Sequence, residues 1–449
     1  MLRKTAIILI LLGLVINHCL AQPSGVYTGN IKVMGQTIDI EVSLTRENDG
    51  FSGHLSIPAQ GASNLRLNSI RHDAPSFTFR VDTATTRLEF EGRYYPDGDS
   101  LSGIFRQSGF EGTYFLTSEN QKEETVDWIR REVFFHNDTI KLAGTLSLPD
   151  TNQLYPAVML ISGSGQQDRD ENVMGFKIFR QLEQYFISRD IAVLRYDDRG
   201  AGASDQGNVE QATSKDFADD ALAGLRYLKN HPFIHPDKAG MLGHSEGSII
   251  ANMVANRTDA AFVVMMAGPV MPGSELLPLQ GKTIMQAEGM DEEKIRKNVE
   301  TNQSIYQEVM KENPDWGHIR ELFRGALQQL DSAKREQTIN QQMPFLKSPW
   351  MKFFLKYDPA GAIAKSDYPV LAIFGGKDTQ VPAEQNVSEL KQVIGNNQLK
   401  NVEIITFDQA NHLFQKADTG SPGEYSKLKK SFVEGFTEKV ADWILMQVE

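Results

Sequence analysis

The first part of the chain alternates apolar and polar residues with a period of two. Between residues 22 and 118 this alternation comes in short runs that Gly, Asp and Pro interrupt, as at 38–42 and 77–81. A period of two predicts strands with one buried face. About six to eight such runs, without any helical period, predict a small antiparallel domain over 22–118, either a barrel or a sandwich.

Continuous apolar runs replace this alternation in the second part of the chain. The runs at 156–161 and 369–374 are typical of strands that a parallel sheet buries on both faces. A hairpin is expected before them, at 132–148. We therefore expect a mostly parallel, doubly wound α/β domain over 133–449, which a charged linker at 119–132 separates from the first domain.

Helical periodicity is strongest in an insertion at 272–360. Segments 285–311 and 319–337 are rich in Glu, Lys, Gln and Arg, with apolar residues three or four positions apart. The apolar runs 343–346 and 349–354 end the insertion. They are placed either to line a substrate pocket or only to pack a helical cap onto the domain, and both roles stay open.

The pentapeptide Gly243-His244-Ser245-Glu246-Gly247 lies between a short apolar run and a helical segment. This is the pattern of a nucleophile elbow, in which the glycines let strand and helix approach closely while the serine takes a strained backbone. The turn exposes the hydroxyl, and the helix N-terminus offers amides to a developing oxyanion. Ser245 is therefore the candidate nucleophile.

Two later residues are candidates for the other members of a triad. Asp378 and His412 each follow a strand-like apolar run. A serine needs a histidine to take its proton, and a carboxylate fixes the tautomer of that histidine. The order Ser245, Asp378, His412 is the chain order of α/β-hydrolase triads. Asp408 is a rival acid, but it lies on the loop of His412 itself, so Asp378 is favoured.

With two further segments, these motifs resemble the α/β-hydrolase superfamily, and within it the secreted bacterial carboxylesterases. Residues 161–170 are similar to the S-G-S-G-x-x-D-R-D segment of that esterase subgroup, and 196–204 resemble the D-x-R-G-x-G-x-S loop of the superfamily. The resemblance implies an α/β-hydrolase fold with a helical cap. It also implies an oxyanion hole formed by the backbone N–H of Ser164 or Gly165 and that of Glu246.

Other polar residues near these motifs have simpler explanations. His244 is expected to pack against the sheet, and Glu246 to act through its backbone amide rather than its side chain. Arg169 and Asp170 are expected to clamp their own loop by ion pairs rather than to touch substrate. His231 and His235 are expected to be loop residues and lack a third clustered ligand, so a zinc site is not expected. Hydrolysis by a serine triad needs neither a metal nor an organic cofactor, so none is expected.

The composition changes the picture in two respects. A net charge of −12 argues against nucleic acid and against an acidic membrane surface as partners. Arg3 and Lys4 precede an apolar run at 6–16, which predicts a signal peptide over 1–21 that is too short to remain as a membrane span. The single cysteine, Cys19, lies inside it. The mature protein is therefore expected to be exported, periplasmic or secreted, without disulfides.

These observations favour a serine hydrolase that cleaves carboxylic esters of small molecules through an acyl-enzyme. One alternative keeps the triad but changes the scissile bond to an amide, thioester or peptide, because the fold does not separate these. Another is an envelope- or carbohydrate-binding protein whose domain at 22–118 carries the function. A retired catalytic site would be free to lose any of its three separate residues, so the intact set favours an enzyme.

Overall fold

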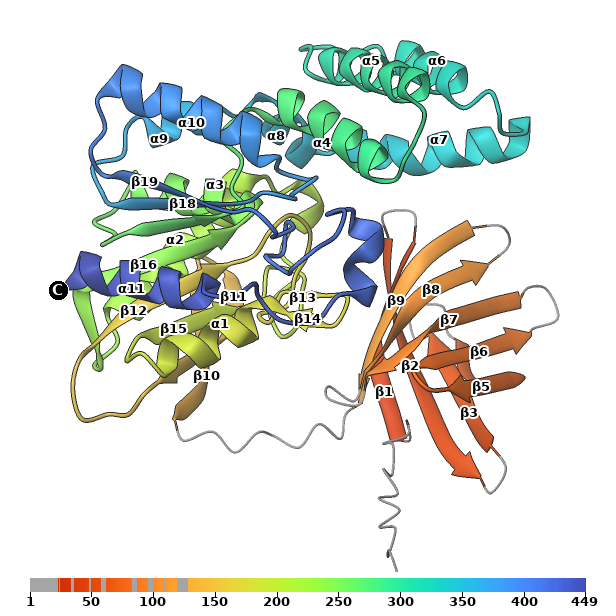
Figure 1. Cartoon of the computed structure of the whole chain (residues 1–449), viewed down its shortest axis with the longest axis horizontal. Helices are drawn as coiled ribbons and strands as arrows, with labels where there is room; N and C mark the ends of the chain where they lie inside the picture. The colour runs from red at the N-terminus through yellow and green to blue at the C-terminus, as the bar shows by residue number, and fades with distance from the viewer. Residues whose placement is uncertain are drawn as a thin grey trace, which may run out of the picture. The chain divides into compact units, whose positions relative to one another are not determined.

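The computed structural model describes residues 23, 25–33, 36–47, 50–57, 62–82, 87–95, 100–107, 110–118 and 128–449. The chain forms two compact units, Met1–Glu123 and Glu124–Glu449 (Figure 1). The signal peptide expected at 1–21 and residues 119–127 of the expected linker lie outside the described residues.

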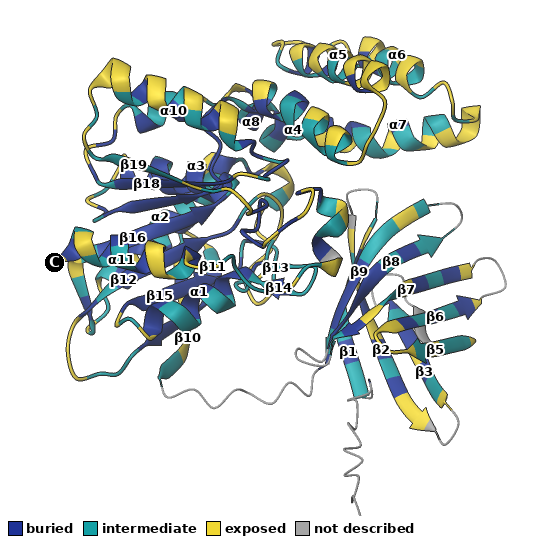
Figure 2. Ribbon diagram, in the orientation of Figure 1, coloured by how far each residue is buried: buried dark blue, intermediate teal, exposed yellow. Residues whose placement is uncertain are grey.

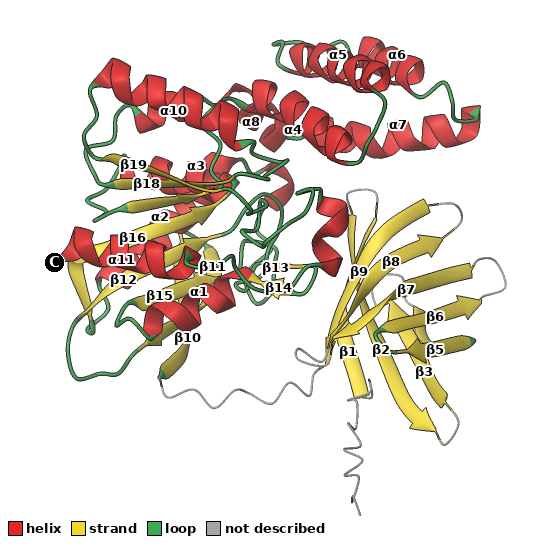
Figure 3. Cartoon of the chain, viewed as in Figure 1, coloured by secondary structure: helices red, strands yellow, loops and turns green. Residues whose placement is uncertain are grey.

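The described part of the first unit forms one antiparallel sheet of nine strands (Figure 3). The strands are β1 (Gly25–Val33), β2 (Gln36–Glu47), β3 (Gly50–Ile57), β4 (Ala62–Arg66), β5 (Ser69–Asp73), β6 (Ser76–Asp82), β7 (Arg87–Tyr95), β8 (Ser100–Gln107) and β9 (Phe110–Ser118). Their order is β4-β3-β2-β1-β9-β8-β7-β6-β5. The backbone N–H of Leu67 donates to the Gly53 carbonyl at 2.9 Å, and that of Asn68 donates to the Arg80 carbonyl at 2.7 Å. These bonds draw the two ends of the sheet toward each other.

The period of two explains why these residues form strands around an aromatic core. Phe77, Phe79 and Val81 of β6 are buried, whereas the residues between them are not. The rings of Phe79 and Phe90 stack at 4.3 Å on the inner face. The predicted all-β domain is confirmed, as a curved sheet rather than a sandwich. It has more strands than the expected six to eight, because the short β4 and β5 carry little alternation.

The second unit is built on an eight-stranded sheet of order β10-β11-β15-β12-β16-β17-β18-β19. The strands are β10 (Ile129–Asn137), β11 (Ile140–Leu148), β12 (Tyr155–Ile161), β15 (Ala192–Tyr196), β16 (Ile234–His244), β17 (Val263–Met266), β18 (Val370–Gly375) and β19 (Val402–Phe407). The β10–β11 and β11–β15 pairs are antiparallel, and all pairs from β15 to β19 are parallel. Every residue of β17 and β18 is buried, as expected for continuous apolar runs inside a parallel sheet.

The start of the hairpin corrects one predicted boundary. β10 begins at Ile129, inside the stretch 119–132 that was expected to be linker, and Ile129 pairs with Leu148. Arg130 lies in the stretch predicted as a charged linker, but it forms an ion pair with Glu183, whose side chain is fully buried. The α/β unit therefore begins before the predicted residue 133.

Helices cover both faces of this sheet, and each face has its own hydrophobic core (Figure 1). On one face lie α1 (Ile178–Ile187) and α11 (Phe436–Val448). On the other face lie α2 (Ser214–Lys229), α3 (Glu246–Ala255), α9 (Pro359–Ile363) and α10 (Ala383–Asn397). A small hairpin of β13 (Asn172–Val173) and β14 (Phe176–Lys177) precedes α1. Figure 2 shows the central strands as the buried layer between these helices.

A helical insertion separates β17 from β18 and matches the cap expected at 272–360. It consists of α4 (Gly273–Ala287), α5 (Glu292–Val309), α6 (Trp316–Ala326), α7 (Ser332–Lys347) and α8 (Pro349–Lys356). Asp or Ser side chains accept backbone N–H groups at the starts of α5 to α8, as helix N-caps do. The insertion has its own core, which includes Ile305, Ile319, Met343 and Leu355. Among the described residues, none of the helices combines the length and the apolar character that a membrane span needs.

Candidate active site

Ser245 occupies a sharp turn between β16 and α3. Its backbone has φ 54° and ψ −120°, a conformation that residues with a side chain rarely adopt. A Cβ on Gly243 would lie 2.0 Å from the Gly247 carbonyl oxygen, and one on Gly247 would lie 2.1 Å from that of Ile161. Both flanking positions must therefore be glycine for strand and helix to approach this closely. The local geometry is that of the nucleophile elbow predicted from the sequence.

Asp378 and His412 lie at the same edge of the sheet, after the carboxyl ends of β18 and β19. His412 Nδ1 is 2.8 Å from Asp378 Oδ2, and both side chains are buried. The other carboxylate oxygen, Asp378 Oδ1, accepts the backbone N–H groups of Gln380 at 2.7 Å and Val381 at 2.8 Å. The rival acid Asp408 is exposed in the turn after β19. The structure thus pairs His412 with Asp378.

His244 connects the serine turn to the loop of His412. Its ring lies 4.8 Å from the His412 ring, centroid to centroid, and its Nε2 is 3.0 Å from the His412 backbone oxygen. His244 directly precedes Ser245, so these contacts bring the nucleophile candidate and the His412–Asp378 pair to one place. His244 was expected only to pack against the sheet. It is instead hydrogen-bonded at both ring nitrogens, on one side to Glu171 at 2.8 Å.

The segment after β12 passes directly over the serine. A Cβ on Gly163 would lie 3.2 Å from the Ser245 Cβ, and the expected oxyanion donors Ser164 and Gly165 follow as exposed residues. Gly165 has φ +98°, which favours glycine. The loop after β12 therefore lies beside Ser245, next to the N-terminus of α3.

Asp198 holds this loop in place through hydrogen bonds. Its carboxyl accepts the Ser162 hydroxyl at 2.8 Å and the backbone N–H of Gln167 at 3.0 Å. Burial raises the pKa of Asp198 to about 8, against the opposing effect of these hydrogen bonds. Arg169 forms an ion pair with Asp197 at 2.7 Å, which fits the structural clamp expected for that arginine.

The side chain of Glu246 has a role that the sequence did not suggest. Its buried carboxyl accepts the Ser214 hydroxyl of α2 at 2.5 Å and the Trp350 indole N–H of α8 at 2.8 Å. A hydrogen bond from Ser164 also reaches it, and burial raises the pKa of Glu246. Glu246, which directly follows Ser245, therefore joins the loop after β12, the body and the cap. A carboxylate at the start of a helix looks like an ordinary exposed residue in sequence, so no signal pointed to this contact.

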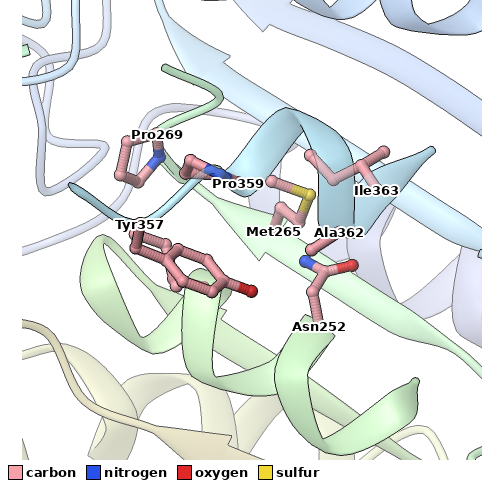
Figure 4. Close-up of a pocket in the computed structure, with 8 residues that line it drawn as sticks. Asn252, Met265, Pro269, Tyr357, Pro359, Ala362 and Ile363 are labelled. Atoms are coloured by element: carbon pink, nitrogen blue, oxygen red, sulfur yellow. The ribbon is translucent and has the colours of Figure 1, made fainter. Parts of the chain in front are cut away.

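A narrow crevice lies between α3 and α9, beside Met265 of β17 (Figure 4). It is lined by Ile249, Asn252, Met265, Pro269, Tyr357, Pro359, Ala362 and Ile363. None of the predicted site residues lines it, so we assign it no role in substrate binding. Among the described residues, no three or more His, Cys, Asp or Glu side chains gather in a way that could hold a metal ion.

The mostly parallel sheet with helices on both faces, the serine elbow, and the His412–Asp378 pair in loops after later strands define the α/β-hydrolase fold. Comparisons with known proteins agree with this class. The family model described as serine aminopeptidase, S33, matches residues 176–337. Esterase EstD of Thermotoga maritima is 29% identical over 352 residues, which cover 77% of this chain and 76% of that protein.

Solved structures with a similar chain course include two hydrolases. The Pyrococcus furiosus esterase PF2001 has a TM-score of 0.46 and 16% identity, and the match covers 74% of this chain and 96% of that one. The α/β hydrolase GrgF of Penicillium has a TM-score of 0.45 and 16% identity, with 71% of this chain and 98% of that one covered.

Proposed function

We propose that the protein is a serine carboxylesterase that cleaves small-molecule esters through an acyl-enzyme. The observation that carries this proposal is the strained Ser245 elbow at the same sheet edge as the His412–Asp378 pair. A geometry of this kind activates a serine hydroxyl, which by itself is a poor nucleophile near neutral pH. The match to esterase EstD supports an ester as the scissile bond.

In this mechanism Ser245 Oγ attacks the ester carbonyl carbon while His412 Nε2 takes the hydroxyl proton. The tetrahedral intermediate collapses, the C–O bond to the alcohol breaks, and His412 returns its proton to the departing oxygen. A water molecule then attacks the acyl-enzyme, again losing its proton to His412, and the acid leaves as Ser245 is regenerated. Asp378 holds His412 in the tautomer with its proton on Nδ1, so that Nε2 is free to accept.

Backbone amides stabilise the negative charge that develops on the carbonyl oxygen. We assign this role to the N–H of Glu246, at the N-terminus of α3, and to that of Ser164 or Gly165 in the loop above the serine. Donors fixed by the backbone need no reorganisation when the charge appears. The three hydrogen bonds on the Glu246 carboxyl support this assignment, because they hold that residue in place.

Cleavage of an amide or peptide bond is the second candidate, because the matching family model is described as a serine aminopeptidase. The two functions differ in turnover of matched substrates. We expect p-nitrophenyl esters of graded acyl length to be cleaved with a kcat/KM far above that of aminoacyl p-nitroanilides. The reverse preference would assign the protein to peptide or amide hydrolysis. We also propose that the protein is exported through its N-terminal leader and that it belongs to the secreted esterase subgroup.

Labelling by a fluorophosphonate probe tests the nucleophile directly. The wild-type protein should be labelled, and Ser245→Ala should be neither labelled nor active while keeping its melting temperature. Ser304→Ala provides the matched control, since Ser304 is an exposed serine on α5. Labelling that persists in Ser245→Ala would remove Ser245 from the mechanism. Absence of labelling and turnover in the wild type would favour the binding-protein alternative.

A further inference from the structure

Behind Ser245 lies a second carboxyl–imidazole pair that the proposed mechanism does not use. Glu171 and His244 are 2% and 3% exposed, and Glu171 Oε1 is 2.8 Å from His244 Nδ1. The same oxygen accepts the backbone N–H of Gly163 at 2.8 Å. At the far end, His244 Nε2 lies 3.0 Å from the backbone oxygen of His412. One carboxylate and one imidazole therefore connect the oxyanion loop to the loop of the general base.

The backbone around this pair is shaped to make the contact. Glu171 adopts φ +47°, a left-handed conformation that is uncommon outside glycine. A Cβ on Gly163 would lie 3.2 Å from Glu171 Oε1 and also 3.2 Å from the Ser245 Cβ. Gly163 is therefore held tightly between the carboxylate and the nucleophile, so a displacement of Glu171 would move the loop beside Ser245.

The hydrogen-bond partners of His244 limit where its ring protons can lie. A backbone carbonyl only accepts, so His244 Nε2 must carry a proton to bond the His412 oxygen. Glu171 Oε1 already accepts the Gly163 N–H, and an ionised carboxylate oxygen also only accepts. One proton is therefore shared between Glu171 Oε1 and His244 Nδ1, and when Glu171 is ionised this proton lies on Nδ1 and makes His244 an imidazolium beside a carboxylate.

We propose that Glu171 and His244 form a buried ion pair that positions the catalytic groups by tying the oxyanion loop at Gly163 to the backbone of His412. The kinetic consequence of this inference rests on the proposed esterase function, whereas the protonation state of Glu171 and His244 does not. Glu171 and His244 touch neither substrate nor reacting atoms in this scheme, so they are positioning residues. Their effect is to keep the oxyanion donors and the His412 ring at fixed positions relative to each other during the reaction.

The charges around His244 agree with this assignment. The groups that face it are Glu171 in the loop before β13, Asp378 after β18, and His412 after β19. Burial alone lowers the pKa of His244, but the Glu171 charge, its hydrogen bond, the His412 carbonyl and the Asp378 charge together raise it above the ordinary value. Glu171 Oε2 is buried without a hydrogen-bond partner within the described residues, so His244 is the hydrogen-bonded partner that the structure gives this carboxyl besides the Gly163 N–H.

Kinetics of Glu171→Gln, His244→Gln and the double variant test the positioning role. The amide introduced by Glu171→Gln keeps an acceptor but removes the charge, so a neutral His244 can no longer donate both to that amide and to the His412 carbonyl. We expect kcat for p-nitrophenyl acetate to fall roughly 10- to 100-fold in each single variant, with KM changed less than about threefold. The double variant should be no slower than the slower single one, since both residues act as a unit.

Glu183→Gln is the matched control. It also removes a fully buried carboxylate from an ion pair, that with Arg195, but it lies outside the proposed machinery. It should lower the melting temperature and leave kcat at the wild-type value. If Glu171→Gln and His244→Gln behaved in the same way, losing stability but not kcat, or if their kinetic effects were additive, the positioning role would be wrong.

Selective ¹⁵N-histidine NMR of the wild type gives a readout that does not depend on turnover. The resonances that His244→Gln removes should show both ring nitrogens protonated near neutral pH. A single protonated nitrogen would overturn the ion pair even in an active esterase. If the wild-type protein were neither labelled nor active, the esterase proposal would fail. The NMR spectrum would then still show whether Glu171 and His244 form an ion pair.

Discussion

Asp378→Asn should be a severe catalytic defect with little structural cost, because the structure dictates how the new amide must sit. Asp378 Oδ1 accepts two backbone N–H groups, those of Gln380 at 2.7 Å and Val381 at 2.8 Å. The oxygen of the introduced amide must take this position, since an NH₂ group there would face two donors. The NH₂ group then points at His412 Nδ1, which is 2.8 Å from the present Oδ2.

This orientation reverses the tautomer of the histidine. With a donor facing it, His412 Nδ1 must accept, so the ring proton moves to Nε2, where it meets Ser245. His412 can then no longer take the serine proton. By analogy with the same substitution in a serine protease, kcat should fall about 10⁴-fold, which corresponds to roughly 5.5 kcal/mol of barrier. All three hydrogen bonds of the residue are kept, so the melting temperature should change little.

The assay is steady-state hydrolysis of p-nitrophenyl acetate, with active sites counted from the initial burst and folding checked by thermal melting. Asp408→Asn is the control, because Asp408 is an exposed carboxylate on the loop next to His412. It should retain kcat within about twofold, as surface substitutions away from the site do. A loss below about tenfold in Asp378→Asn, or a larger loss in Asp408→Asn, would refute the tautomer argument.

Three further predictions concern other parts of the structure. Since burial raises the pKa of Asp198 to about 8 from 3.8, the folded state keeps a proton that the unfolded chain loses between these values. The free energy of unfolding should therefore fall as pH rises through that window, as urea unfolding at several pH values would show. Asp198→Asn should make this pH dependence shallower, and an unchanged dependence on pH in the variant would contradict the argument. Trp350→Phe removes one donor from the buried Glu246 carboxyl and should cost roughly 1–3 kcal/mol of unfolding free energy, whereas Phe345→Leu, at a half-exposed ring on α7, should cost less. A truncated protein that begins at Thr125 should stay folded and hydrolyse small esters at a similar rate, because the whole proposed site lies in the second unit; a folded but inactive product would bring the β domain into the site.

Much of the architecture could be predicted because its cause is local. The alternation along β6 and the buried runs of β17 and β18 each encode a strand within a few residues. The elbow is equally local, since Gly243 and Gly247 mark a crossing of strand and helix that no larger residue allows. The boundary between the linker and the second unit was predicted less accurately, because the first residues of β10 are charged like those of a linker and their partners cannot be seen in the sequence.

The sequence by itself therefore determined the two kinds of domain, the helical insertion, and the order of Ser245, Asp378 and His412. The preference for Asp378 over Asp408 also came from the sequence, and the structure places Asp378 against the histidine. In each case the residue type and its position next to a strand carry the information, so no distant contact is needed.

Only the tertiary structure decided which other polar groups support the site. Glu171 and His244 are 73 positions apart, and Glu246 and Trp350 are 104 apart, so no local pattern links either pair. Carboxylates are usually solvated, and burial is what turns these into fixed partners. Burial and pairing depend on how loops from separate strands meet at one edge of the sheet, and that is a property of the folded chain as a whole.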